Sequence, residues 1–156
     1  MKIQIICIGK TSFNYLDEGI ELYLKRLGHY VPLSWTVLPD LKKSKHWETE
    51  QIKTEEGKIL LKKIPNDAIV TLLDVRGKQL NSEDFSNFIQ KNMISGAKNL
   101  SFIIGGAYGF SEEMYKRANF KISLSKMTFS HQLIRVVFLE QLYRAMTILK
   151  GEPYHH

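Results

Sequence analysis

Short hydrophobic stretches alternate along the chain with longer stretches in which hydrophobic residues recur at helical spacing. Residues 2–8 alternate between hydrophobic and polar positions and predict a first strand. Residues 68–73 and 100–104 are hydrophobic without alternation, which is typical of strands buried on both faces of a sheet. Residues 31–38 and 120–124 complete a set of five predicted strands.

Helical spacing between these strands predicts helices over 13–27 and 47–64, from Asn81 or Ser82 onward, after Ser111, and over 133–149. Strands that alternate with helices indicate an α/β fold with a mostly parallel sheet and helices on both faces. Ligands of such sheets bind beyond the carboxyl ends of the strands. The candidate binding loops are therefore those that follow Leu73, Ile104 and Leu124.

The last predicted helix is hydrophobic on nearly all sides. Ser130 is a suitable N-cap, and Gly151 followed by Pro153 is a usual stop signal. A helix of this kind has to be covered on more than one side. The chain's own sheet can cover one side, and we expect a second copy of the chain, in a homodimer, to cover the other.

Charged residues nevertheless interrupt this helix. His131 and Arg135 are four residues apart and share one face at its start, and Glu140 and Arg144 form a second such pair. Arg144 beside Glu140 is equally consistent with a paired surface charge. Arg135 lies among hydrophobic residues, so its guanidinium needs an anion or a carbonyl to offset its burial.

Composition restricts the class of protein. The 156 residues, 44% hydrophobic and 24% charged, are typical of one globular domain, spanning 1–156. No hydrophobic run approaches the roughly 18 residues of a membrane span, and the lone Cys7 gives neither a disulfide framework nor a zinc site. We therefore expect a cytoplasmic protein without a metal or a membrane partner.

The net charge of +6 permits a polyanionic partner such as RNA, although a solvated basic surface is an equally good interpretation. The basic cluster at 42–46 favours the first interpretation slightly. The glycines at 105, 106 and 109 follow a strand and precede a helix, as in a phosphate-binding turn, but their spacing departs from G-x-G-x-x-G. A plain tight turn remains an alternative. Glycines here would also let a flat adenosine approach the backbone.

Several long motifs resemble one known family. They are Leu124-Ser-Lys-Met-Thr-Phe, His131-Gln, Arg135-Val-Val, Glu140-Gln-Leu-Tyr-Arg-Ala and the terminal Tyr154-His155. In this order and in a chain of this length, they resemble the bacterial ribosomal large-subunit pseudouridine methyltransferase H family of the SPOUT superfamily. The resemblance extends from Lys2 to the end of the chain.

The resemblance implies a cofactor, a substrate and a topology. It implies a C-terminal trefoil knot, which periodicity alone would not predict because threaded chains are rare. It implies S-adenosylmethionine held by backbone groups at Leu73, Gly105, Leu124, Ser125, Lys126, Met127, Thr128 and Phe129. The implied substrate is N3 of a pseudouridine in 23S rRNA of the assembled ribosome.

Methyl transfer to N3 requires removal of its proton and donors for the charge that develops on the ring. His131 or His155 could accept the proton, and Arg135, with Tyr154 or Arg144, could stabilise the ring. A core histidine and a solvated terminal histidine are the structural alternatives for the two bases. The other functions left open are a ribosome-associated binding protein without turnover and a nucleotide-binding reductase.

Overall fold

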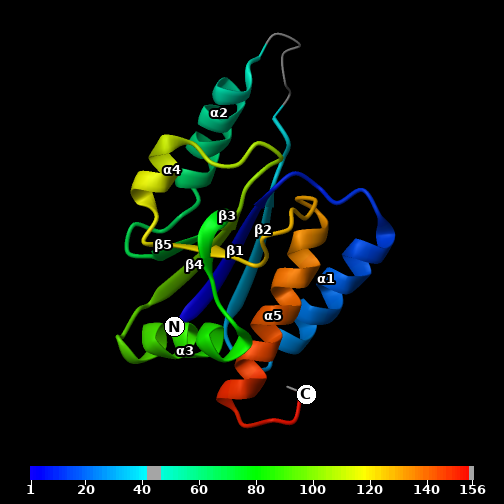
Figure 1. Ribbon diagram of the computed structural model, residues 1–156, viewed down its shortest axis with the longest axis vertical. Coiled ribbons are helices and arrows are strands. Elements are labelled where there is room, and N and C mark those ends of the chain that lie inside the picture. Colours follow the sequence, from blue (N-terminus) through cyan, green and yellow to red (C-terminus); the bar gives the residue numbers. More distant parts are fainter. Residues whose placement is uncertain (42–46, 155–156) are drawn as a thin grey trace.

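A five-stranded parallel sheet forms the centre of the molecule (Figure 1). The computed structural model describes residues 1–41 and 47–154. The strands lie in the order β2-β1-β4-β3-β5. Their bounds are β1 Lys2–Ile8, β2 Leu33–Leu38, β3 Ile69–Gln79, β4 Asn99–Ile104 and β5 Phe120–Ser123. Every pairing between these strands is parallel, so all five carboxyl ends meet at one edge.

Helices cover both faces of this sheet, as predicted (Figure 1). Ile3, Ile5 and Cys7 of β1 point into a core formed with α1 (Asn14–Leu27), α3 (Ser82–Ile94) and α5 (Leu133–Leu149). The alternate residues Ile6 and Ile8 point into a second core beneath α2 (Thr49–Leu61) and α4 (Glu112–Arg117). The side-chain period of two along a strand explains how one strand supplies both cores. The α/β prediction is confirmed.

Most of the predicted elements are present, and their ends move by a few residues. The second strand begins at Leu33 rather than at residue 31, and α2 spans 49–61 rather than 47–64. Gly57 lies in the middle of α2, where a glycine usually weakens a helix. A Cβ at this position would lie 2.3 Å from Ser111 Oγ, so glycine permits the close packing of the Ser111 loop against α2.

The third strand corrects the sequence interpretation. Residues 74–78 were expected to form a loop, but β3 continues to Gln79. The pairing with β5 shifts in register between Leu73 and Lys78, and Ile122 is the partner of both residues. A Cβ on Gly77 would lie 2.6 Å from the Ile122 backbone, so the irregular segment can approach β5 only with glycine there. Periodicity does not reveal a strand that resumes after such a bulge.

The C-terminal end of α5 agrees with the sequence signals, whereas the prediction of Ser130 as N-cap is wrong, because Gln132 precedes the helix and its side chain makes no capping hydrogen bond. The Leu133 amide donates to Ser130 Oγ at 3.1 Å, although a turn at residues 131–132 separates Ser130 from the helix. At the other end, Gly151 has a φ of 67°, and its amide donates to Ile148 O at 3.0 Å. The Glu152 amide donates to Thr147 O at 2.9 Å, which completes a Schellman motif.

Some predictions concern features that the structure does not address. The basic cluster at 42–46 and His155 lie outside the described residues. The trefoil knot concerns the threading of the chain, and it stays a prediction. In the described part of the chain, no helix is long and apolar enough to cross a membrane.

Candidate active site

A cavity of about 650 Å³ lies at the carboxyl edge of the sheet. Its walls come mainly from segments that follow three strands: 73–76 in β3, 104–110 after β4, and 122–131 at and after β5. Lys53 of α2, Tyr115 of α4 and Ile134 of α5 complete it. The size is within the range of pockets that enclose small ligands. The three predicted loops therefore meet, as parallel strands with a common edge require.

The turn after β4 is shaped by what lies behind it. The Gly109 amide donates to Gly106 O at 3.3 Å, and Gly109 has a φ of 85°. A Cβ on Gly106 would lie 2.5 Å from the buried carboxylate of Glu56. A Cβ on Gly105 would lie 3.0 Å from the ring of Phe110, which also lines the cavity. The packing of Phe110 is thus one reason for glycine at 105, and the predicted approach of adenosine to this backbone stays a prediction.

The loop 124–129 forms another wall of the cavity. Leu124, Ser125, Met127, Thr128 and Phe129 line it, whereas Lys126 lies in the loop without lining the cavity. Ser123 Oγ donates to Ser125 O at 2.8 Å, and the Met127 amide donates to Ser125 Oγ at 2.9 Å. These short-range hydrogen bonds hold the loop in a turn whose backbone follows the cavity wall.

Arg135 lies beneath the cavity rather than in it. Its side chain is fully buried and is absent from the cavity wall. Nη1 donates to Gly9 O at 2.8 Å, Nη2 donates to Ile8 O at 2.6 Å, and Nε donates to His131 O at 3.0 Å. Burial with carbonyl partners is what the sequence predicted. The expectation that the guanidinium faces a substrate is wrong for this conformation, because its donors are directed at the end of β1.

A second contact ties the start of α5 to the same region. The Ser12 amide donates to Gln132 Oε1 at 2.7 Å, and Gln132 Nε2 donates to Ser12 Oγ at 3.2 Å. Together with Arg135, this contact fixes the place where the 124–131 segment enters the helix. Gln132 belongs to the His131-Gln motif, but nothing in the sequence indicated its contact with Ser12, which is 120 residues away.

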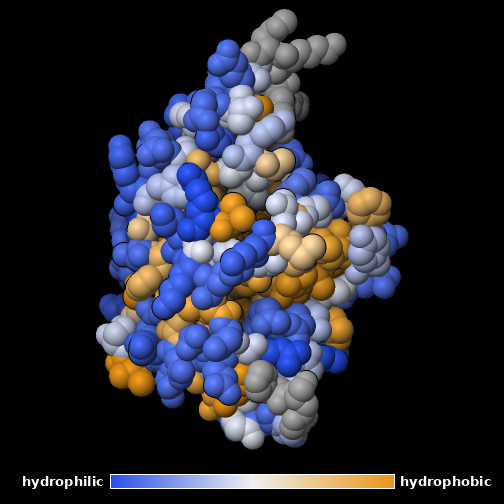
Figure 2. All heavy atoms as spheres, in the orientation of Figure 1, coloured by the Kyte–Doolittle hydropathy of each residue, from blue (hydrophilic) through white to orange (hydrophobic). Residues whose placement is uncertain are grey.

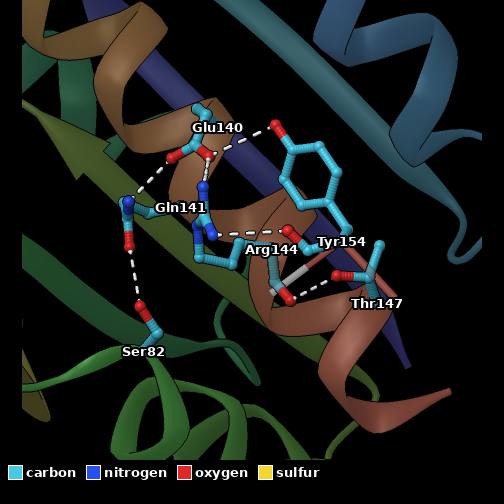
Figure 3. A network of polar contacts seen from close by, with 6 residues as sticks. All are labelled: Ser82, Glu140, Gln141, Arg144, Thr147 and Tyr154. Carbon is cyan, nitrogen blue, oxygen red and sulfur yellow. Dashed lines mark hydrogen bonds and ion pairs between the residues drawn. The ribbon is translucent and has the colours of Figure 1, made fainter. Parts of the chain in front are cut away.

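Arg144 and Tyr154 lie at the opposite end of α5, where the chain after the helix folds back (Figure 3). Glu140 Oε1 accepts hydrogen bonds from Arg144 Nη2 at 2.6 Å and from Tyr154 Oη at 3.3 Å. The Arg144 guanidinium also stacks on the Tyr154 ring, 5.0 Å from its centroid. Gln141 donates to Glu140 and accepts from Ser82, which connects the cluster to α3 (Figure 3).

A hydrogen bond with Tyr23, together with partial burial, raises the pKa of Tyr154 to about 12.

The predicted catalytic residues are therefore not brought together within one chain. His131 lines the cavity, but Arg144 is ten residues beyond Ile134, which corresponds to roughly 15 Å along a helix. The pairing of Arg144 with Glu140, left open by the sequence, is confirmed.

Sequence reasoning missed a polar group on the cavity wall. Asp74, Arg76 and Tyr115 contact one another there. Asp74 and Arg76 follow a buried strand and could have been proposed from that position. Tyr115 belongs to the short helix α4, which lies between β4 and β5 in the sequence, and no local pattern identifies it.

Among the residues that the structure describes, no group of three or more His, Cys, Asp or Glu side chains is arranged to hold a metal ion. The cavity instead offers backbone groups and hydrophobic side chains, a donor set suited to a flat organic molecule.

Comparisons with known proteins agree with this geometry. Residues 1–155 match the profile of a family described as "Predicted SPOUT methyltransferase". The chain is 56% identical over 156 residues to the ribosomal RNA large subunit methyltransferase H of Christiangramia forsetii, covering all of this chain and 99% of that protein. It is 51% identical over 156 residues to the proteins of the same name from Parabacteroides distasonis and Cytophaga hutchinsonii. All of this chain is covered in both cases, with 99% and 100% of those proteins.

A likeness among solved structures concerns the fold alone. The crystal structure of a methylase family protein from Neisseria gonorrhoeae superposes with a TM-score of 0.53 at 15% sequence identity. The match covers 90% of this chain and 81% of that one.

Proposed function

Because this chain belongs to the SPOUT methyltransferase family, we propose that it transfers a methyl group from S-adenosylmethionine to N3 of a pseudouridine in 23S rRNA. Its close relatives carry methylation of large-subunit ribosomal RNA in their names. The observation that supports the proposal most directly is the cavity that three strand-end segments form at the carboxyl edge of the sheet. The assembled ribosome is the proposed substrate, and the cytoplasm is the proposed compartment.

The residues around the cavity fit this cofactor. Backbone at Leu73, Gly105 and 124–129 would hold the adenosine and methionine parts, and Leu73 and Leu124 supply hydrophobic surface. Gly105 and Gly106 line the cavity and have no side chain that could cover their backbone. When bound, S-adenosylmethionine supplies a methyl group on a sulfonium, which an in-line nucleophile can displace.

His131 is the proposed proton acceptor on the same chain. It lines the cavity at the start of α5, and the Arg135 guanidinium bonds its carbonyl. N3 has to lose its proton as the new N–C bond forms, and a neutral imidazole at this position could accept it. Positioning of the base and the methyl group supplies most of the remaining rate enhancement.

Arg144 and Tyr154 can take part only if another copy of the chain supplies them. They lie at the far end of α5 from the cavity of their own chain. We therefore propose a homodimer in which the segment after α5 of one copy completes the cavity of the other. Arg144 and Tyr154 would then donate to the pseudouridine ring as it acquires negative charge.

Transfer of labelled methyl groups tests the function. The protein is incubated with methyl-labelled S-adenosylmethionine and ribosomes from a strain that lacks the modification, and the labelled nucleoside is identified by mass spectrometry. We expect label on N3 of one pseudouridine of 23S rRNA. Label on another nucleoside would refute the proposed position, and cofactor binding without transfer would favour the binding protein without turnover.

Calorimetry separates the remaining alternative. We expect S-adenosylmethionine to bind, whereas NADH and ATP do not. Binding of NADH alone would favour the reductase.

A further inference from the structure

We propose that Arg76 binds a phosphate group of the RNA at the mouth of the cavity. This inference rests on the proposed RNA substrate and adds a contact that positions it. Arg76 lies on the irregular part of β3 between Leu73 and Lys78, and it lines the cavity. Its side chain remains 69% exposed, so its charge faces solvent at the cavity rim rather than the interior.

The guanidinium is held in place by Asp74 and Tyr115. The carboxylate of Asp74 accepts a hydrogen bond from the backbone amide of Arg76 at 2.7 Å and another from the hydroxyl of Tyr115. Arg76 Nη2 donates to the same hydroxyl, and the guanidinium carbon lies 4.8 Å from the centroid of the Tyr115 ring. An arginine on a long flexible side chain loses entropy when it binds an anion. The contacts with Tyr115 already restrict the Arg76 side chain before an anion binds, so less entropy is lost on binding.

Asp74 does not neutralise the group fully. The Arg76 Nε lies 3.6 Å from Asp74 Oδ1, a long contact, and the Asp74 side chain is only 6% exposed. The hydrogen bond with Tyr115 and the nearby carboxylate raise the pKa of Arg76, which therefore keeps its charge. A guanidinium has five N–H donors, and the contacts with Tyr115 and Asp74 use only some of them. The remaining donors match the paired oxygens of a phosphate.

Three lysines belong to the elements that form this part of the molecule, and one of them lies beside Tyr115. Lys121 Nζ lies 5.7 Å from the centroid of the Tyr115 ring, and Lys53 lines the cavity. Lys53 is paired with Glu50 at 2.5 Å, so its charge is partly balanced. The exposed Lys126 belongs to the loop 124–129. Arg76 and Lys121 therefore place two positive charges beside Tyr115, where a polyanion would pass while one of its bases enters the cavity.

The carboxylate of the cofactor is the competing anion. We would expect an arginine that binds a small ligand inside the cavity to be mostly buried in the cavity wall. Arg76 is held on the outer face of Tyr115 and is mostly exposed. This placement favours an anion that approaches from outside the cavity.

The test compares Arg76→Gln, Arg76→Lys and the control Lys91→Gln. Lys91 is an exposed cation in the last turn of α3, so its replacement removes the same charge elsewhere. Three quantities are measured for each: the KM for ribosomes, the filter-binding Kd for ribosomes over a salt series, and the calorimetric Kd for S-adenosylmethionine.

For Arg76→Gln we expect the KM and the Kd for ribosomes to rise about tenfold, as for the loss of one charge-assisted hydrogen bond. The slope of log affinity against log salt should fall by about one, as for one phosphate contact. Arg76→Lys should recover the salt slope and part of the affinity. The cofactor Kd should stay unchanged in all three variants, and Lys91→Gln should behave like the wild type.

Three results would overturn the proposal: an unchanged ribosome affinity, an equal loss in Lys91→Gln, or a weaker cofactor Kd in Arg76→Gln with ribosome binding intact. The last would assign the guanidinium to the cofactor. The filter-binding measurement does not require turnover. A wild-type protein that binds ribosomes without methylating them would therefore refute the proposed function, while the Arg76 contact would still be tested.

Discussion

Three backbone carbonyls converge on the guanidinium of Arg135 and tie the start of α5 to the end of β1. A buried charge is costly unless its donors are satisfied, and here the carbonyls of Ile8, Gly9 and His131 satisfy them. The contact also sets the position of His131 at the cavity, because Arg135 Nε donates to the His131 carbonyl just before the helix. We therefore regard Arg135 as a positioning residue for the loop before the helix.

Replacement of Arg135 by lysine tests this role. Lysine cannot reach three carbonyls with one ammonium group, so we expect the free energy of unfolding to fall by about 2 kcal/mol. The affinity for S-adenosylmethionine should fall as well, because the 124–131 segment loses its anchor. Urea denaturation and calorimetry measure the two effects.

Arg117→Lys is the matched control. Arg117 Nη2 donates to Pro65 O at 3.0 Å and to Ala68 O at 2.9 Å, and Arg117 is not part of the cavity wall. It should lose stability while it retains cofactor affinity. Equal cofactor affinity in both variants would show that Arg135 is structural only.

Cys7 offers a second prediction at this scale. Burial raises the pKa of its thiol to about 12, although the charge of Arg135 opposes the shift. Since the thiolate is the reactive form, we expect no labelling of the native protein by a thiol reagent at pH 8 and complete labelling in urea. Rapid labelling of the native protein would contradict the described packing of β1.

The same shift has a consequence for stability. The folded state holds the thiol proton more tightly than the unfolded chain, so this contribution is complete below the ordinary thiol pKa of about 8.5. It is lost as the pH rises toward 12. The free energy of unfolding should therefore decrease over this alkaline range.

At the scale of elements, the turn between β4 and α4 is the most constrained part of the site. Gly105 is required by the neighbouring ring of Phe110 and Gly106 by the carboxylate of Glu56, as much as by any ligand. A side chain added here acts on the cavity through its neighbours. The resulting loss of binding would come with a loss of stability.

Gly105→Val tests this account. The added side chain has to displace the ring of Phe110, which is 5% exposed in the second core. Overpacking of this kind costs roughly 1–3 kcal/mol. We expect a lower melting temperature and no measurable S-adenosylmethionine binding in calorimetry.

Gly28→Ala is the control for this variant. Gly28 ends α1 with a φ of −58°, and an added Cβ makes only ordinary contacts, at 3.4 Å or more. It should bind the cofactor normally. Unchanged binding by Gly105→Val would remove the turn from the proposed pocket.

At the scale of the molecule, α5 has the cavity at one end and the Arg144–Tyr154 cluster at the other. Hydrophobic residues near the cavity end remain exposed, among them Leu133 at 39% and Phe13 at 55%. Figure 2 shows hydrophobic surface over α5 and the start of α1 on this face. An exposed surface of this type is typical of an interface, and it supports the proposed homodimer.

Mixed dimers test the shared site. One subunit lacks residues 154–156, and the other carries Gly105→Val, so that each alone is inactive. If the terminal segment acts on the neighbouring cavity, a verified heterodimer should recover one complete site and about half of the wild-type activity per dimer, since a two-fold dimer has two sites. Inactive heterodimers, or a monomer in sedimentation, would refute the shared site.

The local pattern of the chain determined much of this structure. Hydrophobic pattern alone predicted the strands at 68–73 and 100–104 and the helix at 133–149. It could do so because the length and spacing of hydrophobic residues indicate the type of element and how many of its faces are buried. Parallel strands share a carboxyl edge, so the meeting of Leu73, Gly105 and Leu124 at one cavity followed as well. The motifs at 124–129 and 140–145 also identified the family, which the comparisons confirm.

Only the tertiary structure decided where the long polar side chains point. The guanidinium of Arg135 donates to carbonyls more than 120 residues away in the sequence. Tyr154 joins the Glu140–Arg144 pair only because the chain after α5 folds back. The bulged continuation of β3 and its contacts with Tyr115 likewise depend on β5 and α4. A helical or strand period specifies the face on which a residue lies, but the partner on that face is supplied by another part of the chain.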